Sequence, residues 1–478
     1  MSSATPSGRF QSTRNDARLV TDDAQTTRLA IAAITRSPHD APQHDAAPYD
    51  APPVEPAGPG DHPLIYQLLR TVFHAPSDSE FHAQLDHPRY EPTHRLLVRR
   101  RGAPAAHLRA CPREIRFGGV DLAADYLADL ACLPEFRRRG FATALLAAAE
   151  REAARHAADL LLLRTSLPAF YAARGWIVCG RHCYSSAPPR NILAMLSTLA
   201  AEKQAEKTVS VRESTAPRLR VRLWRHIEQE RIMQLYADAA AASYGALVRS
   251  EAYWHWLLCR RGYDHIYVAV ERAADEPAAE EEVIVGYAVM HRGRIVELVA
   301  QQQRGDVKAA LLARACGDAI ERDEHSVRFD GPPGDPLHAM FQQADGVHRW
   351  REVDGDLVHM VKVLDPLRLV RRLADLLHQR AREAALTRPF ELGVDCEGNR
   401  FCLVGTRRSV RIETGRLGRS YLTCSPSGLT QLLLGHHDAS SALAAEHCTA
   451  STRTAETVAA ALFPRLPLWY PPLDDLPA

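Results

Sequence analysis

Tyr126-Leu-Ala-Asp-Leu-Ala-Cys-Leu-Pro-Glu-Phe-Arg-Arg-Arg-Gly-Phe-Ala-Thr-Ala-Leu-Leu146 is the stretch that decides the fold. The apolar run 127–133 predicts a strand that ends at Pro134. The Ala/Leu/Glu run from Gly140 to about His156 predicts a helix. The first turn of a helix has backbone N–H groups without partners and carries a partial positive charge. The junction therefore predicts a place where an anion binds.

The residues around this junction suit a phosphate group. Gly140 and Ala142 keep bulk away from the exposed amides, so a ligand can approach the backbone closely. Arg137, Arg138 and Arg139 add positive charge and fork-shaped donors. The pattern is Arg-x-x-Gly-x-Ala directly after a strand. On these six residues alone, a solvated basic turn at a helix N-terminus is an equally good interpretation.

The hexapeptide resembles the pyrophosphate-binding signature of the Gcn5-related N-acetyltransferases, whose consensus is Arg/Gln-x-x-Gly-x-Gly/Ala. A buried-strand pattern follows at 159–165, and Pro168-Ala-Phe-Tyr-Ala-Ala-Arg-Gly-Trp176 comes next. This second piece resembles the family segment in which a tyrosine on a short helix lies beside the thioester. The two pieces stand in the family's order and at its spacing, so the resemblance predicts an acetyltransferase-type domain.

Composition sets limits on the class of protein. A chain of 478 residues exceeds what one hydrophobic core usually serves, so two to four domains are expected. With 46% hydrophobic and 24% charged residues, the composition is that of an ordinary globular protein. The 59 basic and 58 acidic residues nearly balance, which gives no preference for nucleic acid. We find neither a signal peptide nor an apolar run of membrane-spanning length, so we expect a cytoplasmic protein with no membrane partner.

No metal site is predicted. The ten cysteines are scattered and none forms a Cys-x-x-Cys pair, as expected for free thiols in a reducing compartment. Cys179-Gly-Arg-His-Cys183 lacks a second ligand pair at zinc-like spacing. His436-His437-Asp438 is interpreted as a loop after a helix, because no further spaced ligands accompany it.

Four segments are predicted along the chain. Residues 1–60 form a Pro/Ala-rich disordered tail. Residues 61–190 read as a helix, antiparallel strands and two strand-helix units, the layout expected of a mixed acetyltransferase sheet with helices on both faces. Residues 210–363 echo this order, but Gln301-Gln-Gln-Arg-Gly305 precedes the helix in place of the signature, so this domain is expected to be degenerate. Residues 364–478 predict a helix, four strands and two helices, which resemble a sterol-carrier-protein-like module.

The whole order resembles the Eis-like (enhanced intracellular survival) family. That family joins an active acetyltransferase domain, a degenerate one and a sterol-carrier-like α+β domain, so the fold class is α/β with mixed sheets. Only residues 126–180 carry specific motifs, and the N-terminal tail departs from the family pattern. The resemblance also implies a homo-oligomer, a hexamer in the family.

The resemblance implies where acetyl-CoA, the co-substrate, binds. The pantetheine arm pairs with the open backbone of the central strand at Leu130, Ala131 and Cys132. The arm is contacted again at the end of the next strand, by Ser166 and Leu167. Arg137 is ranked below the other arginines because its side chain can point outward. The pyrophosphate is held by Arg138, Arg139, Gly140, Phe141, Ala142 and Thr143.

The catalytic groups follow from the same resemblance. Tyr171 matches the tyrosine that protonates the departing thiolate, although core packing with Phe170 and Trp176 is the alternative. The general base that would deprotonate the amine is not assigned to one residue. Asp129, with Asp125 on the same strand and His107 on a neighbouring one, is one candidate. The C-terminal carboxylate of Ala478 is another, as in Eis-like enzymes, with Asp474 and Asp475 near it in the chain.

These expectations combine into an acetyl-CoA-dependent N-acetyltransferase. The acceptor is a primary amine, either of a small polyamine or aminoglycoside-like molecule or of a lysine side chain, and it attacks directly in a ternary complex. The alternative is a non-catalytic protein that senses acyl-CoA with its first domain or binds an apolar ligand in its C-terminal sterol-carrier-like domain.

Overall fold

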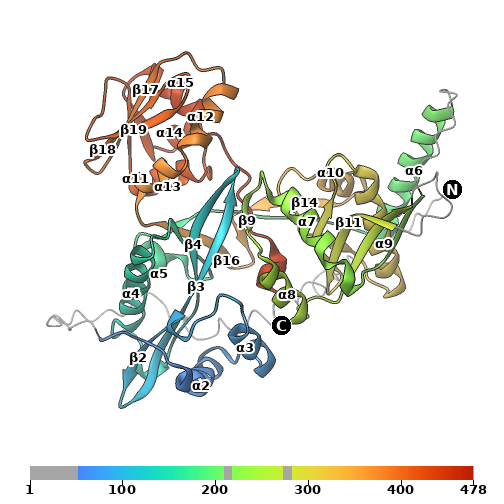
Figure 1. The fold of residues 1–478 in the computed structure, drawn as a ribbon, viewed down its shortest axis with the longest axis horizontal. Coiled ribbons are helices and arrows are strands. Elements are labelled where there is room, and N and C mark those ends of the chain that lie inside the picture. Colours follow the sequence, from blue (N-terminus) through green and yellow to red (C-terminus); the bar gives the residue numbers. More distant parts are fainter. Residues whose placement is uncertain (1–51, 209–217, 273–281, 477–478) are drawn as a thin grey trace, which may run out of the picture.

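The computed structural model describes residues 52–208, 218–272 and 282–476, and three sheets organise them (Figure 1). The first sheet has the order β1-β2-β3-β4-β5-β16-β15, with β6 beside β16 and β9 beside β3. Its strands are β1 (Glu55–Pro56), β2 (Arg95–Arg100), β3 (Ala103–Phe117), β4 (Val120–Cys132), β5 (Leu160–Thr165), β6 (Ile177–Val178), β9 (Tyr244–Leu247), β15 (Val353–Asp354) and β16 (Leu357–Val363). The prediction of a mixed α/β fold is confirmed.

The helices of the first body lie where the sequence predicts them, with one addition. They are α2 (His62–Phe73), α3 (Asp78–Leu85), α4 (Phe141–Arg155) and α5 (Pro168–Ala172), with short 3-10 turns at Pro59–Asp61, Pro92–His94 and Pro134–Phe136. The unpredicted helix α3 begins at a capping box in which Ser77 and Glu80 bond each other's backbone amides. The expected tail 1–60 ends earlier than predicted, because β1 pairs with β2. Residues 1–51 lie outside the described part of the chain.

The second sheet has the order β14-β7-β13-β12-β11-β10-β8. Its strands are β7 (His182–Ala187), β8 (Arg218–Leu223), β10 (His265–Arg272), β11 (Glu282–His291), β12 (Arg294–Ala300), β13 (Val327–Phe329) and β14 (Val347–Arg351). The helices of this body are α6 (Pro189–Thr208), α7 (Gln229–Ala240), α8 (Glu251–Cys259), α9 (Gly305–Glu321) and α10 (Pro336–Gln343), with a 3-10 turn at His226–Glu228. The element order of the first body recurs here, as the sequence indicates.

The two bodies exchange strands, which corrects the expected boundary between 61–190 and 210–363. Strand β7, from the first expected segment, lies between β14 and β13 of the second sheet. Strand β16, from the second, pairs with all of β5 through its residues 358–363, in the first sheet. Alternation along a strand says which face is buried but not which sheet contributes the neighbour, so the sequence pattern could not assign these two strands.

The third body, in orange and red in Figure 1, contains a five-stranded sheet of order β19-β18-β17-β20-β21. Its strands are β17 (Phe390–Cys396), β18 (Asn399–Gly405), β19 (Val410–Thr414), β20 (Tyr421–Cys424) and β21 (Cys448–Ala450). Its helices are α11 (Pro366–Arg372), α12 (Ala374–Glu383), α13 (Pro426–Leu433), α14 (Ala439–Ala444) and α15 (Arg453–Leu462). His436 follows α13 and Asp438 caps α14, so this segment is the predicted loop.

After α15 the chain returns between the first and second bodies (Figure 1). Trp469 donates its backbone N–H to the carbonyl of Tyr244, and a side chain at Gly245, where φ is 104°, would overlap the Trp469 carbonyl. A 3-10 turn at Pro472–Asp475 ends this segment. Within it, the Asp474 carboxylate accepts hydrogen bonds from the buried Arg249 guanidinium at 2.9 Å, and Arg249 also contacts Glu297 at 2.7 Å.

Within the described ranges, we find no helix that combines the length and the apolar character needed to cross a membrane.

We predict that the contact between Arg249 and Asp474 holds the C-terminal segment in place. Asp474→Asn removes one of the two carboxylates that neutralise a buried guanidinium, so the free energy of unfolding should fall by about 1.5–3 kcal/mol, the range for a hydrogen bond to a charged group. Urea unfolding measures it. Asp475→Asn is the matched control, since Asp475 only reaches Arg113 at 3.4 Å, and it should cost clearly less. Equal losses in the two variants would contradict this assignment.

Candidate functional site

The central strands β4 and β5 run parallel at first and then part. Their pairing covers Ala124–Leu160, Asp125–Leu161 and Tyr126–Leu162, and no later pair joins them within the described residues. The other neighbour of β4 continues, because β3 pairs with β4 up to Cys132. On the side facing β5, the segment 127–132 therefore has an open backbone edge. Leu130, Ala131 and Cys132, the predicted pantetheine residues, lie on this edge.

A bulge in β4 accompanies the parting. His107 faces Ala131 and Arg109 faces Ala128, so β4 carries one extra residue there, and Asp129 takes a positive φ of 56°. The His107 Nδ1–H donates to the Asp129 carbonyl at 2.9 Å, which fixes the imidazole tautomer. The other ring nitrogen, Nε2, lies 3.3 Å from a guanidinium nitrogen of the buried Arg95.

His107 and Asp129, the two residues on these strands that were predicted as candidates for the general base, are both engaged by arginine side chains. Burial, together with Arg95, lowers the pKa of His107 to about 3, so the ring is neutral and both nitrogens are engaged. Burial alone would raise the pKa of Asp129, but the Arg109 guanidinium, 2.6 Å from its carboxylate, outweighs burial and keeps that pKa below its ordinary value. Asp125 does not join them, because its carboxylate bonds His156 at 3.1 Å. Asp129 and His107 therefore stabilise the bulge.

The N-terminus of α4 is prepared for an anion. Gly140 is the N-cap residue in the left-handed region, no side chain caps the helix, and its first turn contains no acidic residue. A Cβ at Gly140 would meet no atom within 4 Å, so the space beside the turn is open. Arg138 and Arg139 are exposed, and the Arg139 guanidinium lies 5.5 Å from the centre of the Phe136 ring.

Other predicted binding residues have structural contacts as well. The Phe141 ring is buried and packs against Phe136, with ring centroids 6.0 Å apart. Ala142 is half-buried in the first turn of α4. The side chain of Arg137, which was expected to be able to point outward, turns back and donates from Nε to the Cys132 carbonyl at 3.3 Å.

The structure brings the second motif next to the first. The Arg174 guanidinium, just after α5, donates to the Thr143 hydroxyl at 2.9 Å, which links α5 to the first turn of α4. Ser166 and Leu167 form the connection between β5 and α5, and Leu167 is 42% exposed. The predicted residues 130–132, 138–143 and 166–167 thus gather where the carboxyl ends of β4 and β5 diverge.

Tyr171 lies in this group, on α5. Its ring meets Phe170 and Trp176 edge to face, with centroids 5.0 and 6.0 Å apart. Burial raises the pKa of Tyr171 to about 12, against the opposing effect of Arg174. The phenol therefore keeps its proton at neutral pH. The packing contacts and a proton-donating role are compatible, because the ring packs while the hydroxyl remains the polar end.

The corresponding helix of the second body does not offer such an anion site at its N-terminus. The helix α9 corresponds to α4 in order, but Asp306 lies in its first turn. A hydrogen bond from Arg304 and others from backbone amides, including that of Val307, lower the pKa of Asp306, so a carboxylate already occupies the place of a bound anion.

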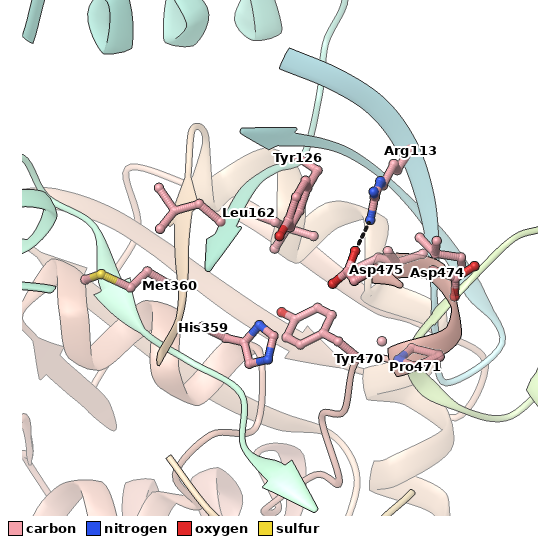
Figure 2. A pocket seen from close by; sticks show the side chains of 13 residues that line it. Arg113, Tyr126, Leu162, His359, Met360, Tyr470, Pro471, Asp474 and Asp475 are labelled. Carbon is pink, nitrogen blue, oxygen red and sulfur yellow. Dashed lines mark hydrogen bonds and ion pairs between the residues drawn. The ribbon is translucent and has the colours of Figure 1, made fainter. Parts of the chain in front are cut away.

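A pocket opens on the other side of the first sheet, where β4 and β5 part (Figure 2). Arg113, Tyr126 and His359 reach it from β3, β4 and β16 of the first sheet, and Tyr470 reaches it from the C-terminal segment. The further lining residues are Ile115, Leu162, Leu163, Gly245, Leu247, Met360, Pro471, Asp474 and Asp475. The sequence analysis did not identify Arg113, Tyr126, His359 or Tyr470, which come from distant segments and share no motif.

The C-terminal segment lines part of this pocket. Asp474 is 4% exposed and bound to Arg249, whereas Asp475 contacts Arg113 at 3.4 Å. Ala478, the predicted source of a terminal carboxylate, lies outside the described residues.

Comparisons with known proteins agree with this geometry. Residues 53–179 match the family model described as an acetyltransferase (GNAT) domain. Among solved structures, a GCN5-related N-acetyltransferase from Anabaena variabilis has a TM-score of 0.64 at 16% identity, covering 87% of this chain and 98% of that chain. A probable N-acyltransferase from Enterococcus faecalis gives 0.62 at 15%, covering 87% and 96%.

Eis1 from Mycobacterium abscessus gives a TM-score of 0.57 at 14% identity, covering 86% of this chain and 97% of that chain. At such identities the likeness shows the fold alone. No curated protein sequence matches the chain significantly. The parted strands, the uncapped helix and the matched family model together lead to one conclusion: residues 53–179 form a GNAT acetyltransferase domain.

Proposed function

We propose that this protein is an acetyl-CoA-dependent N-acetyltransferase that acts on a primary amine. The observation that carries the proposal is the open edge of β4 at residues 127–132, which leads to the uncapped N-terminus of α4. An extended chain of amides can pair with the open edge of β4, and a pyrophosphate can bind at the N-terminus of α4. Acetyl-CoA contains both groups in this order.

In this proposal the pantetheine arm pairs with Leu130, Ala131 and Cys132 as an added strand. The N–H and C=O groups on that edge need partners, and the amides of the arm supply them. The amides at Gly140, Phe141 and Ala142, together with the exposed Arg138 and Arg139, then hold the pyrophosphate. Ser166 and Leu167 border the arm from β5.

Tyr171 supplies the proton for the departing thiolate. Its raised pKa keeps the phenol protonated until it is needed, and α5 is tied to α4 by Arg174 and Thr143. The acceptor amine then attacks the thioester carbonyl directly, in a ternary complex that removes the entropy of encounter. The amine loses a proton in the step, and the sulfur gains one.

We place the approach of the acceptor on the side of the first sheet where the small pocket of Figure 2 lies. Asp129 is set aside as the base, because Arg109 pairs with its carboxylate. The remaining candidates belong to the C-terminal segment. Of its two described carboxylates, Asp475 has the longer ion pair and is the one we propose to face the amine. The acceptor class remains the one that the sequence predicts, a small-molecule amine or a lysine side chain. The homo-oligomer implied by the family resemblance likewise remains a prediction.

Gly140→Glu should weaken acetyl-CoA binding. The new carboxylate would stand at the helix N-terminus and repel the pyrophosphate, so affinity should fall about tenfold or more, equivalent to about 1.4 kcal/mol. The shift in melting temperature on adding acetyl-CoA measures this loss of affinity, because a ligand at 100 times its dissociation constant stabilises the wild-type chain by about 2.7 kcal/mol. Gly119→Glu is the control. Gly119 also has a positive φ, 89°, and open surroundings, but lies in the β3–β4 turn. An unchanged melting shift in Gly140→Glu would refute the pyrophosphate site.

Tyr171→Phe should lower kcat about 100-fold or more while acetyl-CoA affinity is kept, because the variant removes only the proton donor. Initial rates from released thiol, with a panel of amines, measure the effect. In the wild type, no alkaline loss of rate from this group is expected below a pH of about 12, since the protonated form is the active one. Tyr66→Phe, on α2, is the matched control. Absence of turnover in the wild type would favour the alternative, an acyl-CoA sensor or apolar-ligand carrier.

A further inference from the structure

Three side chains that commonly ligate metals meet inside the second body. Cys183 lies on β7, His338 on α10 and His348 on β14, and each offers one donor atom within 4.8 Å of the others. The Cys183 sulfur is 3.4 Å from His338 Nε2. The cysteine and His338 are 3% and 5% exposed, and His348 is half-buried. This cluster is separate from the acetyl-CoA site, which the first body contains.

The sheet register explains how the three side chains meet. Cys183 and Ser185 lie two residues apart on β7, so they point to the same buried face. His348 faces Ser185 across the β7–β14 pair, which places its ring on that face as well. His338 approaches from α10, and its ring centroid is 4.4 Å from that of His348.

The Ser185 hydroxyl orients both imidazoles. Its oxygen lies 2.9 Å from His338 Nδ1 and 3.0 Å from His348 Nδ1. In the tautomer that ligation through Nε2 requires, each ring carries its proton on Nδ1 and both donate to the two lone pairs of this oxygen. Each Nε2 then has a free lone pair. A hydrogen-bond acceptor behind each histidine is the usual outer shell of a metal site, because it fixes the tautomer and the ring orientation.

The donor set selects the kind of ion. One thiolate and two imidazoles suit zinc, at about 2.3 Å for Zn–S and 2.0–2.1 Å for Zn–N. A tetrahedral centre with these bonds separates sulfur from nitrogen by about 3.6 Å, close to the distance between Cys183 and His338. His338 Nε2 also lies 3.1 Å from the Pro332 carbonyl, a contact in which Nε2 carries the proton. To ligate the ion, this ring must therefore move its proton to Nδ1 and turn away from the carbonyl.

We infer that Cys183, His338 and His348 form a zinc site whose fourth position is open to water. Binding replaces the thiol proton of Cys183, which leaves to solvent, by a bond from sulfur to the ion. The ion would fasten α10 and β14 to β7, the strand that enters this sheet from the first segment of the chain. It would thereby secure the strand exchange between the two bodies.

The test uses the full-length chain, treated with a chelator and titrated with Co²⁺. One equivalent of Co²⁺ should give the near-ultraviolet band of a cobalt–thiolate bond, and Zn²⁺ should remove the band. Cys183→Ser should lose it, and Ser185→Ala should weaken Co²⁺ affinity about 10- to 100-fold. Circular dichroism of each variant checks its fold.

Cys316→Ser is the matched control, because Cys316 is another fully buried cysteine of the same body, and it should keep the band. If Cys183→Ser does not fold, His348→Gln replaces it, since a half-buried position tolerates the change better, and Co²⁺ affinity should fall at least tenfold. A wild-type chain without the thiolate band, or a band that survives Cys183→Ser, would overturn the inference.

Discussion

Backbone hydrogen bonding is the constraint on which the site depends. A strand at the centre of a sheet normally pairs on both sides, and unpaired N–H and C=O groups cost free energy wherever water is excluded. Here β4 loses its partner after Tyr126, while β16 covers the far edge of β5. The bulge at Asp129, held by His107 and Arg109, bends β4 at this point. An open edge in the middle of a sheet is thus built into the fold, where a ligand with its own amides can complete the pairing.

The rest of the chain surrounds this opening. The second body contributes β9 and β16 to the first sheet, and the C-terminal segment runs beside β9 to the pocket. The ion pairs of Asp474 with Arg249 and of Asp475 with Arg113 bring groups from three distant parts of the sequence to one place. The α4 side receives the proposed acetyl-CoA, and the pocket side receives the proposed acceptor.

Local signals predicted much of the fold from the sequence. The apolar run before Pro134, the Gly140 cap and the periodicity of 141–155 are short-range features, and the elements lie where these place them. The exchange of β7 and β16 depends on which strands pair with each other, and the alternation of apolar and polar residues along a strand does not identify its pairing partner. The same limit applies to the site. Tyr171 and residues 138–143 belong to motifs, whereas Arg113, His359 and the proposed zinc ligands are neighbours only in space. Asp129 and His107 each have an arginine beside them, Arg109 and Arg95, and the sequence does not show these contacts.

The most direct measurement of the central claim is hydrogen exchange by mass spectrometry, with and without acetyl-CoA. We predict that acetyl-CoA slows exchange in peptides covering 127–133 and 138–144, because the ligand then occupies the open edge of β4 and the amides of the α4 N-terminus. Peptides from β17 and β18 in the third body should be unaffected. Unchanged exchange at 127–133 under saturating acetyl-CoA, or protection confined to another part of the chain, would contradict the account.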